Sequence, residues 1–255
     1  MILDSFRLDG KVAIITGART GIGQGIALAM AEAGADVVGV GNKPMPEIAE
    51  QIRALGRGFT EISADLTRPC PELYDRVISG TLNAYGRVDI LVNNAGIIRR
   101  CDAIDFNETD WDDVMNINLK TLFFLSQAAA RQMVKQQSGG KIVNIASMLS
   151  YQGGIRVPSY TASKSGVMGL TRLLANEWAK YGINVNAIAP GYIDTNNTEA
   201  LKKDPVRSAE ILGRIPAGRW GTPRDMAGTA VFLASEASSY MQGFTVALDG
   251  GWLAR

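Results

Sequence analysis

The stretch VAIITGARTGIG, residues 12–23, joins a continuous apolar run to a glycine-rich turn and then to the start of a helix. After the turn, apolar residues recur at helical spacing: Ile22, Ile26, Met30 and Ala33. A turn between a buried strand and a helix places backbone amides and the positive end of the helix dipole where a diphosphate can bind. Side chains in place of Gly17, Gly21 and Gly23 would collide with that ligand. The stretch therefore predicts a dinucleotide site, with an unliganded tight turn as the alternative.

The strand-then-helix unit repeats along the chain. We expect further buried strands over 35–41, 59–66, 88–94, 140–147, 183–190 and 244–250, and helices over 46–56, 71–86, 108–137, 158–181 and 223–235. Parallel strands need crossover connections, which cover both faces of the sheet. The pattern predicts an α/β fold: one Rossmann-like, doubly wound domain over residues 1–255 with a seven-stranded parallel sheet. The irregular segment 192–221 is expected to be a substrate lid.

Composition argues against several classes of function. Lysine and arginine number 26 against 25 acidic residues, so no basic field predicts a nucleic-acid partner. No apolar run reaches the roughly 20 residues that a membrane span needs, and no leader segment is recognisable. The chain has no histidine, and Cys70 and Cys101 lack the spacing of metal ligands, so we expect no metal site and no disulfide. Two free thiols predict a cytoplasmic protein.

Polar residues follow two of the predicted strands. Asp65, with Leu66 beside it, ends the third strand, where a carboxylate can accept a hydrogen bond from an adenine amino group; an exposed loop aspartate is the alternative. The fourth strand ends in NNAG, residues 93–96, which can bond neighbouring strands and admit a ribose, or can be a simple turn.

A phenol and an ammonium lie four residues apart in SYTASKSG, residues 159–166. Tyr160 and Lys164 therefore share one helix face and can reach the same site. A packed tyrosine beside a solvated lysine would give the same pattern. Ser147 at the end of the fifth strand, Asn118 in the long preceding helix and the upstream glycine turn favour a catalytic interpretation.

Taken together, these motifs resemble those of the short-chain dehydrogenase/reductase family: TGARTGIG, NNAG, MNINLK around Asn118, Ser147, YTASK and PGYIDT at 190–195. The resemblance covers essentially the whole chain. It implies that Tyr160 is the catalytic acid/base, that Ser147 holds the substrate oxygen, that Lys164 binds the nicotinamide ribose, and that Asn118 anchors a water that relays protons. The expected nucleotide contacts are Gly17, Arg19, Thr20, Gly21, Ile22, Gly23, Asn42, Asp65, Leu66, Asn93, Ala95, Gly96, Tyr160, Lys164, Pro190, Gly191, Ile193 and Thr195.

Electrostatics supports the assignment of Tyr160. Lowering a phenol pKa from near 10 to about 7 requires roughly 4 kcal/mol in favour of the phenolate. An ammonium about 4 to 5 Å away supplies about 3 to 4 kcal/mol at an effective dielectric constant of about 20, before desolvation subtracts from it. We therefore expect Lys164 to lower the pKa of Tyr160, with further help from oxidised nicotinamide.

The residues near the end of the second predicted strand point to both nucleotides. NAD-preferring members usually carry an aspartate at the end of the second strand, where this chain has Gly41 or Asn42. Arg19 and Lys43 could instead meet a 2′-phosphate. We expect NAD, with NADP not excluded, because several stretches resemble the family's dehydrogenases of 2-keto-3-deoxygluconate and 2-deoxygluconate in uronic acid breakdown.

Those stretches include GIIRR (96–100), NIASMLSYQGGIRVPSYTASKSGVMG (144–169) and APGYIDTNNT (189–198). They imply a hexulosonate sugar acid as substrate. Its carboxylate needs a cation, for which Arg156 is the first candidate and Arg99 or Arg100 the second; each could be a surface or subunit-contact residue. The resemblance also implies a homotetramer. A 3-oxoacyl or other ketone reductase, and a non-catalytic dinucleotide-sensing protein, are the alternatives.

Overall fold

The computed structural model describes all 255 residues, Met1–Arg255. Seven parallel strands form one sheet in the order β3-β2-β1-β4-β5-β6-β7, which confirms the predicted fold class. The strands are β1 (Val12–Thr16), β2 (Asp36–Gly41), β3 (Phe59–Ser63), β4 (Ile90–Asn93), β5 (Gly140–Ile145), β6 (Ile183–Pro190) and β7 (Thr245–Leu248). Each strand lies within its predicted range. Central strands such as β1 are buried on both faces and leave a continuous apolar run in the sequence, whereas the edge strands β3 and β7 are only partly buried.

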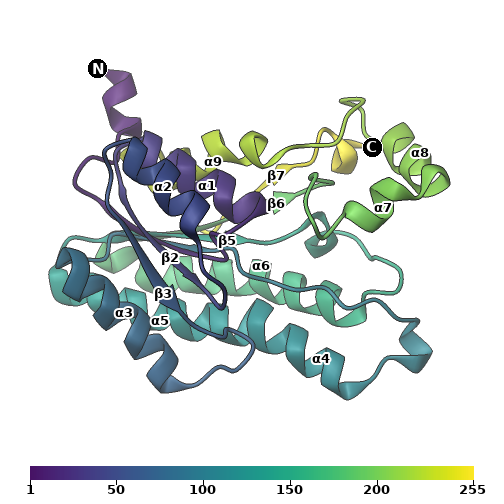
Figure 1. Cartoon of the computed structure of the whole chain (residues 1–255), viewed down its shortest axis with the longest axis horizontal. Coiled ribbons are helices and arrows are strands. Elements are labelled where there is room, and N and C mark those ends of the chain that lie inside the picture. The colour runs from purple at the N-terminus through teal and green to yellow at the C-terminus, as the bar shows by residue number, and fades with distance from the viewer.

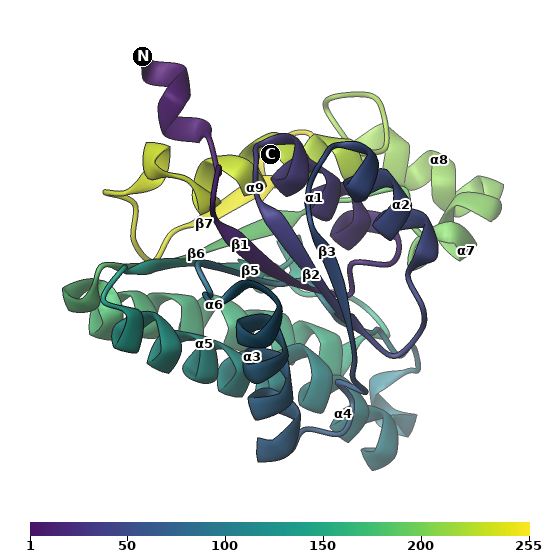
Figure 2. The same ribbon diagram turned by 60° about the vertical axis from the view of Figure 1, so that its left-hand side comes forward.

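Helices cover both faces of the sheet, as Figure 1 and Figure 2 show from two directions. One face carries α1 (Gly21–Glu32), α2 (Pro46–Ala54) and α9 (Ala227–Ala234), and the other carries α3 (Pro71–Tyr85), α5 (Leu122–Gln136) and α6 (Pro158–Trp178). Each layer encloses its own apolar core, around Met30 on the first face and Leu125 on the second. None of these helices combines the length and apolar composition that crossing a membrane requires.

The order of strands reverses at β1. The chain builds outward from β1 to β3 and returns through α3 to β4, so Ile14 of β1 pairs with Val38 of β2 on one side and with Leu91 of β4 on the other. The loops that follow β1 and β4 then leave the sheet in opposite directions. A crevice opens between them at the carboxyl ends of the strands, where ligands bind in sheets of this kind.

The predicted helix over 108–137 is not a single α-helix. It consists of α4 (Glu108–Met115), a π-helical segment (Asn116–Thr121) and α5. The apolar periodicity of the sequence runs through all three parts and does not reveal the change in hydrogen-bond register. Asn118 lies inside the π-helical segment, and such segments occur frequently at functional sites.

The predicted lid segment, 192–221, contains two helices, α7 (Glu199–Lys203) and α8 (Pro205–Arg214). The Asp204 side chain caps α8 by accepting hydrogen bonds from two backbone amides, at 3.0 Å each. Trp252, near the carboxyl terminus, packs with α8 in a small apolar cluster, and the Arg214 guanidinium lies 3.9 Å from its ring centroid. The segment is therefore folded against the end of the chain, although its sequence looks irregular.

Candidate active site

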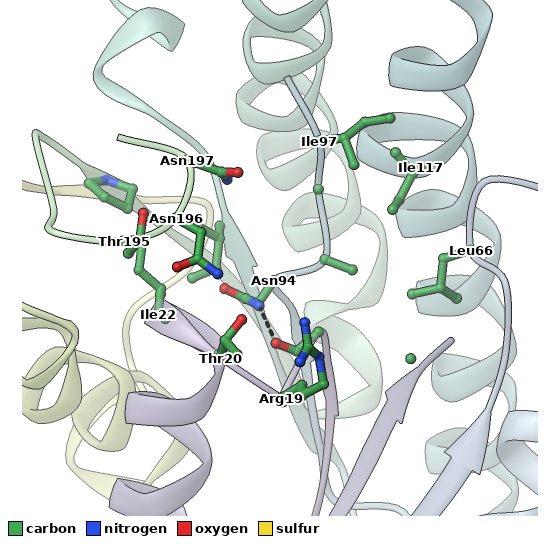
Figure 3. A pocket seen from close by; sticks show the side chains of 18 of the residues that line it. Arg19, Thr20, Ile22, Leu66, Asn94, Ile97, Ile117, Thr195, Asn196 and Asn197 are labelled. Carbon is green, nitrogen blue, oxygen red and sulfur yellow. Dashed lines mark hydrogen bonds between the residues drawn. The ribbon is translucent and has the colours of Figure 1, made fainter. Parts of the chain in front are cut away.

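A cavity of about 430 Å³ lies beyond the carboxyl ends of the strands, on both sides of the β1–β4 crevice. Its lining combines the glycine turn, the ends of β2 to β6 and the first part of the lid segment. Figure 3 shows Arg19 and Thr20 on the glycine turn, with Ile97 and Ile117 across the cavity from Thr195. The fold thus brings residues from most of the chain into one site.

The glycine turn does not accommodate a side chain at Gly17, Gly21 or Gly23. Gly17 and Gly21 have φ angles of +69° and +62°, which side chains rarely adopt. A Cβ atom on Gly23 would lie 2.2 Å from the carbonyl oxygen of Gly17. The Asn94 side chain, labelled in Figure 3, holds the turn from the other wall. It donates to the Thr16 and Gly17 carbonyl oxygens at 2.9 and 3.3 Å. The turn and the first residues of α1 therefore fit a closely approaching diphosphate.

The structure also assigns different roles to the two asparagines of NNAG. Asn93 does not line the cavity; its buried side chain donates to Ser126 Oγ and Asn144 Oδ1, both at 2.9 Å, beneath the site. Asn94, Ala95 and Gly96 do line it. Our sequence interpretation did not single out Asn94, although its place directly after a buried strand was a usable signal.

The charges that line the cavity favour an anionic ligand. Arg19, Lys43 and Lys164 are the lining cations, and Asp65 is the only lining acid. A hydrogen bond from the Thr67 hydroxyl, at 2.7 Å, lowers the pKa of Asp65 and keeps it ionised. No carboxylate follows β2, where Gly41 and Asn42 line the cavity together with Lys43.

The catalytic candidates meet at the other end of the cavity. Ser147 follows β5, and its hydroxyl accepts a hydrogen bond of 3.1 Å from the Leu149 amide. Tyr160 and Lys164 project from the first turns of α6, with the ammonium 5.7 Å from the centre of the phenol ring. Lys164 is 4% exposed and donates to the Ile145 carbonyl oxygen at 2.6 Å. The side chains of Ser147, Tyr160 and Lys164, from the loop after β5 and from α6, therefore line the same part of the cavity.

The pKa of Tyr160 differs from our sequence-based expectation. Burial raises it above the ordinary value for a phenol, and the Ser147 hydroxyl and the positive charge of Arg100 offset only part of that rise. Burial also lowers the pKa of Lys164 to about 8. The expected lowering by Lys164 fails here because desolvation of the phenolate outweighs the nearby charges.

Asn118 lies behind the cavity wall and does not line it. It is 1% exposed, its Oδ1 accepts from the Ile97 amide at 2.9 Å, and its Nδ2 donates to the Ile97 carbonyl at 3.1 Å. Gly96 passes so close that a Cβ atom there would lie 3.0 Å from Asn118 Oδ1 and 3.8 Å from Lys164 Nζ. Asn118 thus fixes the loop that forms the wall beside Lys164.

The end of β6 closes the site. Pro190, Gly191, Ile193 and Thr195 line the cavity as predicted from PGYIDT. A Cβ atom on Gly191 would lie 2.6 Å from the Asp249 backbone, which explains the glycine. The structure adds lining residues that lie within the quoted stretches but were given no role in the sequence analysis: Ile97, Ile117, Asn196, Asn197 and Thr198.

The three arginines proposed for a carboxylate lie in different surroundings. Arg156 is mostly exposed and pairs with Asp102 at 2.9 Å, and Arg99 pairs with Asp110 at 3.0 Å. Arg100 is exposed as well, and none of the three lines the cavity. Arg100 donates to the Asn197 carbonyl oxygen at 3.1 Å, and its charge offsets a small part of the rise that burial causes in the pKa of Tyr160. Of the three, only Arg100 forms a hydrogen bond with a residue that lines the cavity.

Comparison with known proteins agrees with this geometry. A family model described as enoyl-(acyl carrier protein) reductase matches residues 17–253. The chain is 63% identical over 257 residues to the 2-dehydro-3-deoxy-D-gluconate 5-dehydrogenase of Escherichia coli, with 100% of both chains covered. A crystal structure from Agrobacterium tumefaciens with bound NADP is 54% identical, with a TM-score of 0.92, over 98% of this chain and 99% of that one. The gluconate 5-dehydrogenase of Burkholderia cenocepacia, in complex with NADP and tartrate, is 38% identical with a TM-score of 0.94 and full coverage of both chains.

Proposed function

Because the chain belongs to the short-chain dehydrogenase/reductase family, we propose that it is an oxidoreductase that transfers a hydride reversibly between NAD(H) and a hexulosonate sugar acid. The reaction interconverts a 5-keto hexulosonate and 2-keto-3-deoxygluconate, in uronic acid breakdown. One observation carries the proposal: a single cavity joins a glycine turn suited to a diphosphate with Ser147, Tyr160 and Lys164.

Each catalytic side chain has a defined task in this reaction. The nicotinamide, when bound, supplies or accepts the hydride. Tyr160 donates its hydroxyl proton to the ketone oxygen during reduction and takes it back during oxidation. Ser147 donates a hydrogen bond to the same oxygen, on which negative charge grows in the transition state. Lys164 places an ammonium beside the phenol ring, and Asn118 holds the wall next to it.

The substrate assay tests the proposal directly. With NADH, the purified protein should reduce a 5-keto hexulosonate much faster than a 3-oxoacyl thioester or a simple ketone, as followed by nucleotide absorbance. Faster turnover of the 3-oxoacyl thioester would favour the reductase alternative, which needs the same catalytic residues. No turnover together with tight nucleotide binding would favour a dinucleotide-sensing protein.

We propose Arg100 as the residue that holds the substrate carboxylate, rather than Arg156 or Arg99. Its neighbour Asn197 lines the cavity, and its charge acts on Tyr160. Arg100→Ala should raise the KM for hexulosonates by about 10- to 100-fold, because a hydrogen bond to a charged group contributes about 1.5 to 3 kcal/mol. The KM for uncharged ketones should change little. Arg156→Ala is the matched control, and a larger effect of that substitution would return the role to Arg156.

For the nucleotide, we propose NAD(H), with NADP(H) also accepted. The absence of a carboxylate after β2 removes the group that usually repels a 2′-phosphate, and Lys43 lies at the same place. Lys43→Ala should lower kcat/KM for NADPH about tenfold and leave kcat/KM for NADH nearly unchanged. Equal losses with both nucleotides would contradict a 2′-phosphate role for Lys43.

We further propose a cytoplasmic homotetramer. The free thiols of Cys70 and Cys101 suit a reducing compartment. Phe124 on α5 and Leu173 on α6 are exposed apolar side chains on helices that the family resemblance places at subunit contacts. Sedimentation equilibrium of the purified protein measures the number of subunits.

A further inference from the structure

We propose that Ser163 is a positioning residue, whose hydroxyl ties Asn118 to the first turns of α6 and thereby fixes Tyr160 and Lys164 relative to the cavity wall. The proposal rests on the proposed function for its readout, since a positioning role is measured through turnover. Ser163 touches neither the cavity nor any reacting atom. Its effect must therefore pass through the residues that it holds.

The hydroxyl of Ser163 makes two hydrogen bonds with opposite roles. It accepts from Asn118 Nδ2 at 3.1 Å and donates to the carbonyl oxygen of Tyr160 at 2.8 Å. The residue is completely buried, so water cannot replace either bond. A short bridge thus runs from the side chain of Asn118 to the backbone of Tyr160.

This bridge completes the hydrogen bonding of Asn118. Its Oδ1 accepts from the Ile97 amide, and its two Nδ2 hydrogens go to the Ile97 carbonyl and to Ser163 Oγ. The amide side chain is therefore held in one orientation by two separate segments of the chain. Removing the Ser163 hydroxyl leaves one buried N–H without an acceptor, which favours rotation of Asn118 or a shift of the π-helical segment.

The other side of the same helical turn is also held. The Ser150 hydroxyl donates to the Lys164 carbonyl oxygen at 2.6 Å, and the Lys164 ammonium donates to the Ile145 carbonyl. The start of α6 is thus fixed to β5 by Lys164 and to the turn after β5 by Ser150, while Ser163 fixes it to the π-helical segment. Without Ser163, one of the two attachments is lost while the catalytic side chains themselves remain.

A second buried serine provides the control. Ser159 is also completely buried at the start of α6, but its hydroxyl has no hydrogen-bond partner. Ser159→Ala removes the same atom from the same helix without breaking a bond. It should leave kcat within about twofold of the wild-type value.

Ser163→Ala should lower kcat about tenfold, because small misplacement of catalytic groups is costly. The dissociation constant for NADH, measured by protein fluorescence, should stay within about twofold. Turnover is measured with whichever carbonyl substrate the wild-type protein reduces fastest, so an incorrect sugar-acid assignment does not compromise the test. A wild-type protein without turnover on any carbonyl substrate would reject the oxidoreductase function and the positioning role together.

A double-mutant cycle with Asn118→Ala separates positioning from general stability. If Ser163 acts through Asn118, Ser163→Ala should change kcat little in the Asn118→Ala background. The same loss of kcat in both backgrounds would overturn the proposal. An unchanged kcat in Ser163→Ala would also overturn it. The same holds if the two substitutions are coupled only in the thermal unfolding midpoints of the four proteins and not in kcat.

Discussion

Tyr160→Phe is expected to lower kcat by about 10³-fold while leaving the dissociation constant for NADH within a factor of about two. The substitution keeps the ring at the start of α6 but removes the hydroxyl that exchanges a proton with the substrate oxygen. Burial already raises the pKa of this phenol, so the hydroxyl is well suited to remain protonated and to donate during reduction. No other phenol lines the cavity.

The measurement combines steady-state kinetics with a fluorescence titration of NADH. Tyr240→Phe is the matched control, because that side chain is fully exposed. Its kinetics should equal those of the wild-type protein. Residual activity of Tyr160→Phe above about one tenth would assign the proton transfer to another group.

Lys164→Met is expected to lower kcat by about 10²- to 10³-fold. At neutral pH it should also raise the electrostatic contribution to the free energy of unfolding. The loss of turnover follows from removing the charge beside Tyr160 and the donor to the Ile145 carbonyl. The gain in the free energy of unfolding follows from removing a buried charge, since burial lowers the pKa of Lys164 from 10.5 to about 8. Such a difference corresponds to about 3 kcal/mol of unfolding free energy.

The sign of the pH dependence provides a specific test. A lysine whose pKa is lowered by folding binds fewer protons in the folded protein than in the unfolded chain between about pH 8 and 10.5. The buried charge therefore lowers the free energy of unfolding by its full amount below pH 8, and this destabilisation disappears as the pH rises toward 10.5. The electrostatic advantage of Lys164→Met over the wild-type protein should shrink across that range.

Urea unfolding at several pH values between about 7 and 9.5 measures this difference. Lys135→Met, at an exposed lysine of α5, is the control. The difference in the free energy of unfolding between Lys135→Met and the wild-type protein should not change comparably with pH. A difference between Lys164→Met and the wild-type protein that stays constant with pH would contradict a buried, partly neutral Lys164.

Most of the fold was predictable because its signals are local. Central strands are buried on both faces and leave apolar runs in the sequence, and the periodicity of a helix can be recognised in a short window. All seven strands lie within their predicted ranges, the partly buried edge strands β3 and β7 included. The pairing of Tyr160 with Lys164 followed from helical spacing in the same way. The glycine turn was also predictable from the sequence, because its glycines are required by the local path of the backbone. A residue larger than glycine at position 23 would collide with the Gly17 carbonyl oxygen.

The remaining details depend on contacts between distant segments. Nothing near Arg156 in the sequence reveals that Asp102 pairs with it, or that the lid segment places the Asn197 carbonyl beside Arg100. Likewise, the pKa of Tyr160 depends on how deeply several elements enclose it, and a count of neighbouring charges omits that enclosure. Sequence reasoning therefore predicted that Ser147, Tyr160 and Lys164 share one site, as they do, but did not reveal the residues that surround them.

The π-helical segment between α4 and α5 has a consequence for insertions and deletions. One residue advances an α-helix by about 100°. A π-helical turn takes one residue more than an α-helical turn, so this segment absorbs an extra residue without turning α4 relative to α5. Deleting one residue from 116–121 would restore a regular helix in which α4 still packs on α6 and α5 on α3, but it would remove the widened turn that carries Asn118. A single deletion here should therefore leave the fold intact, whereas a second one, which turns α4 by about 100°, should not.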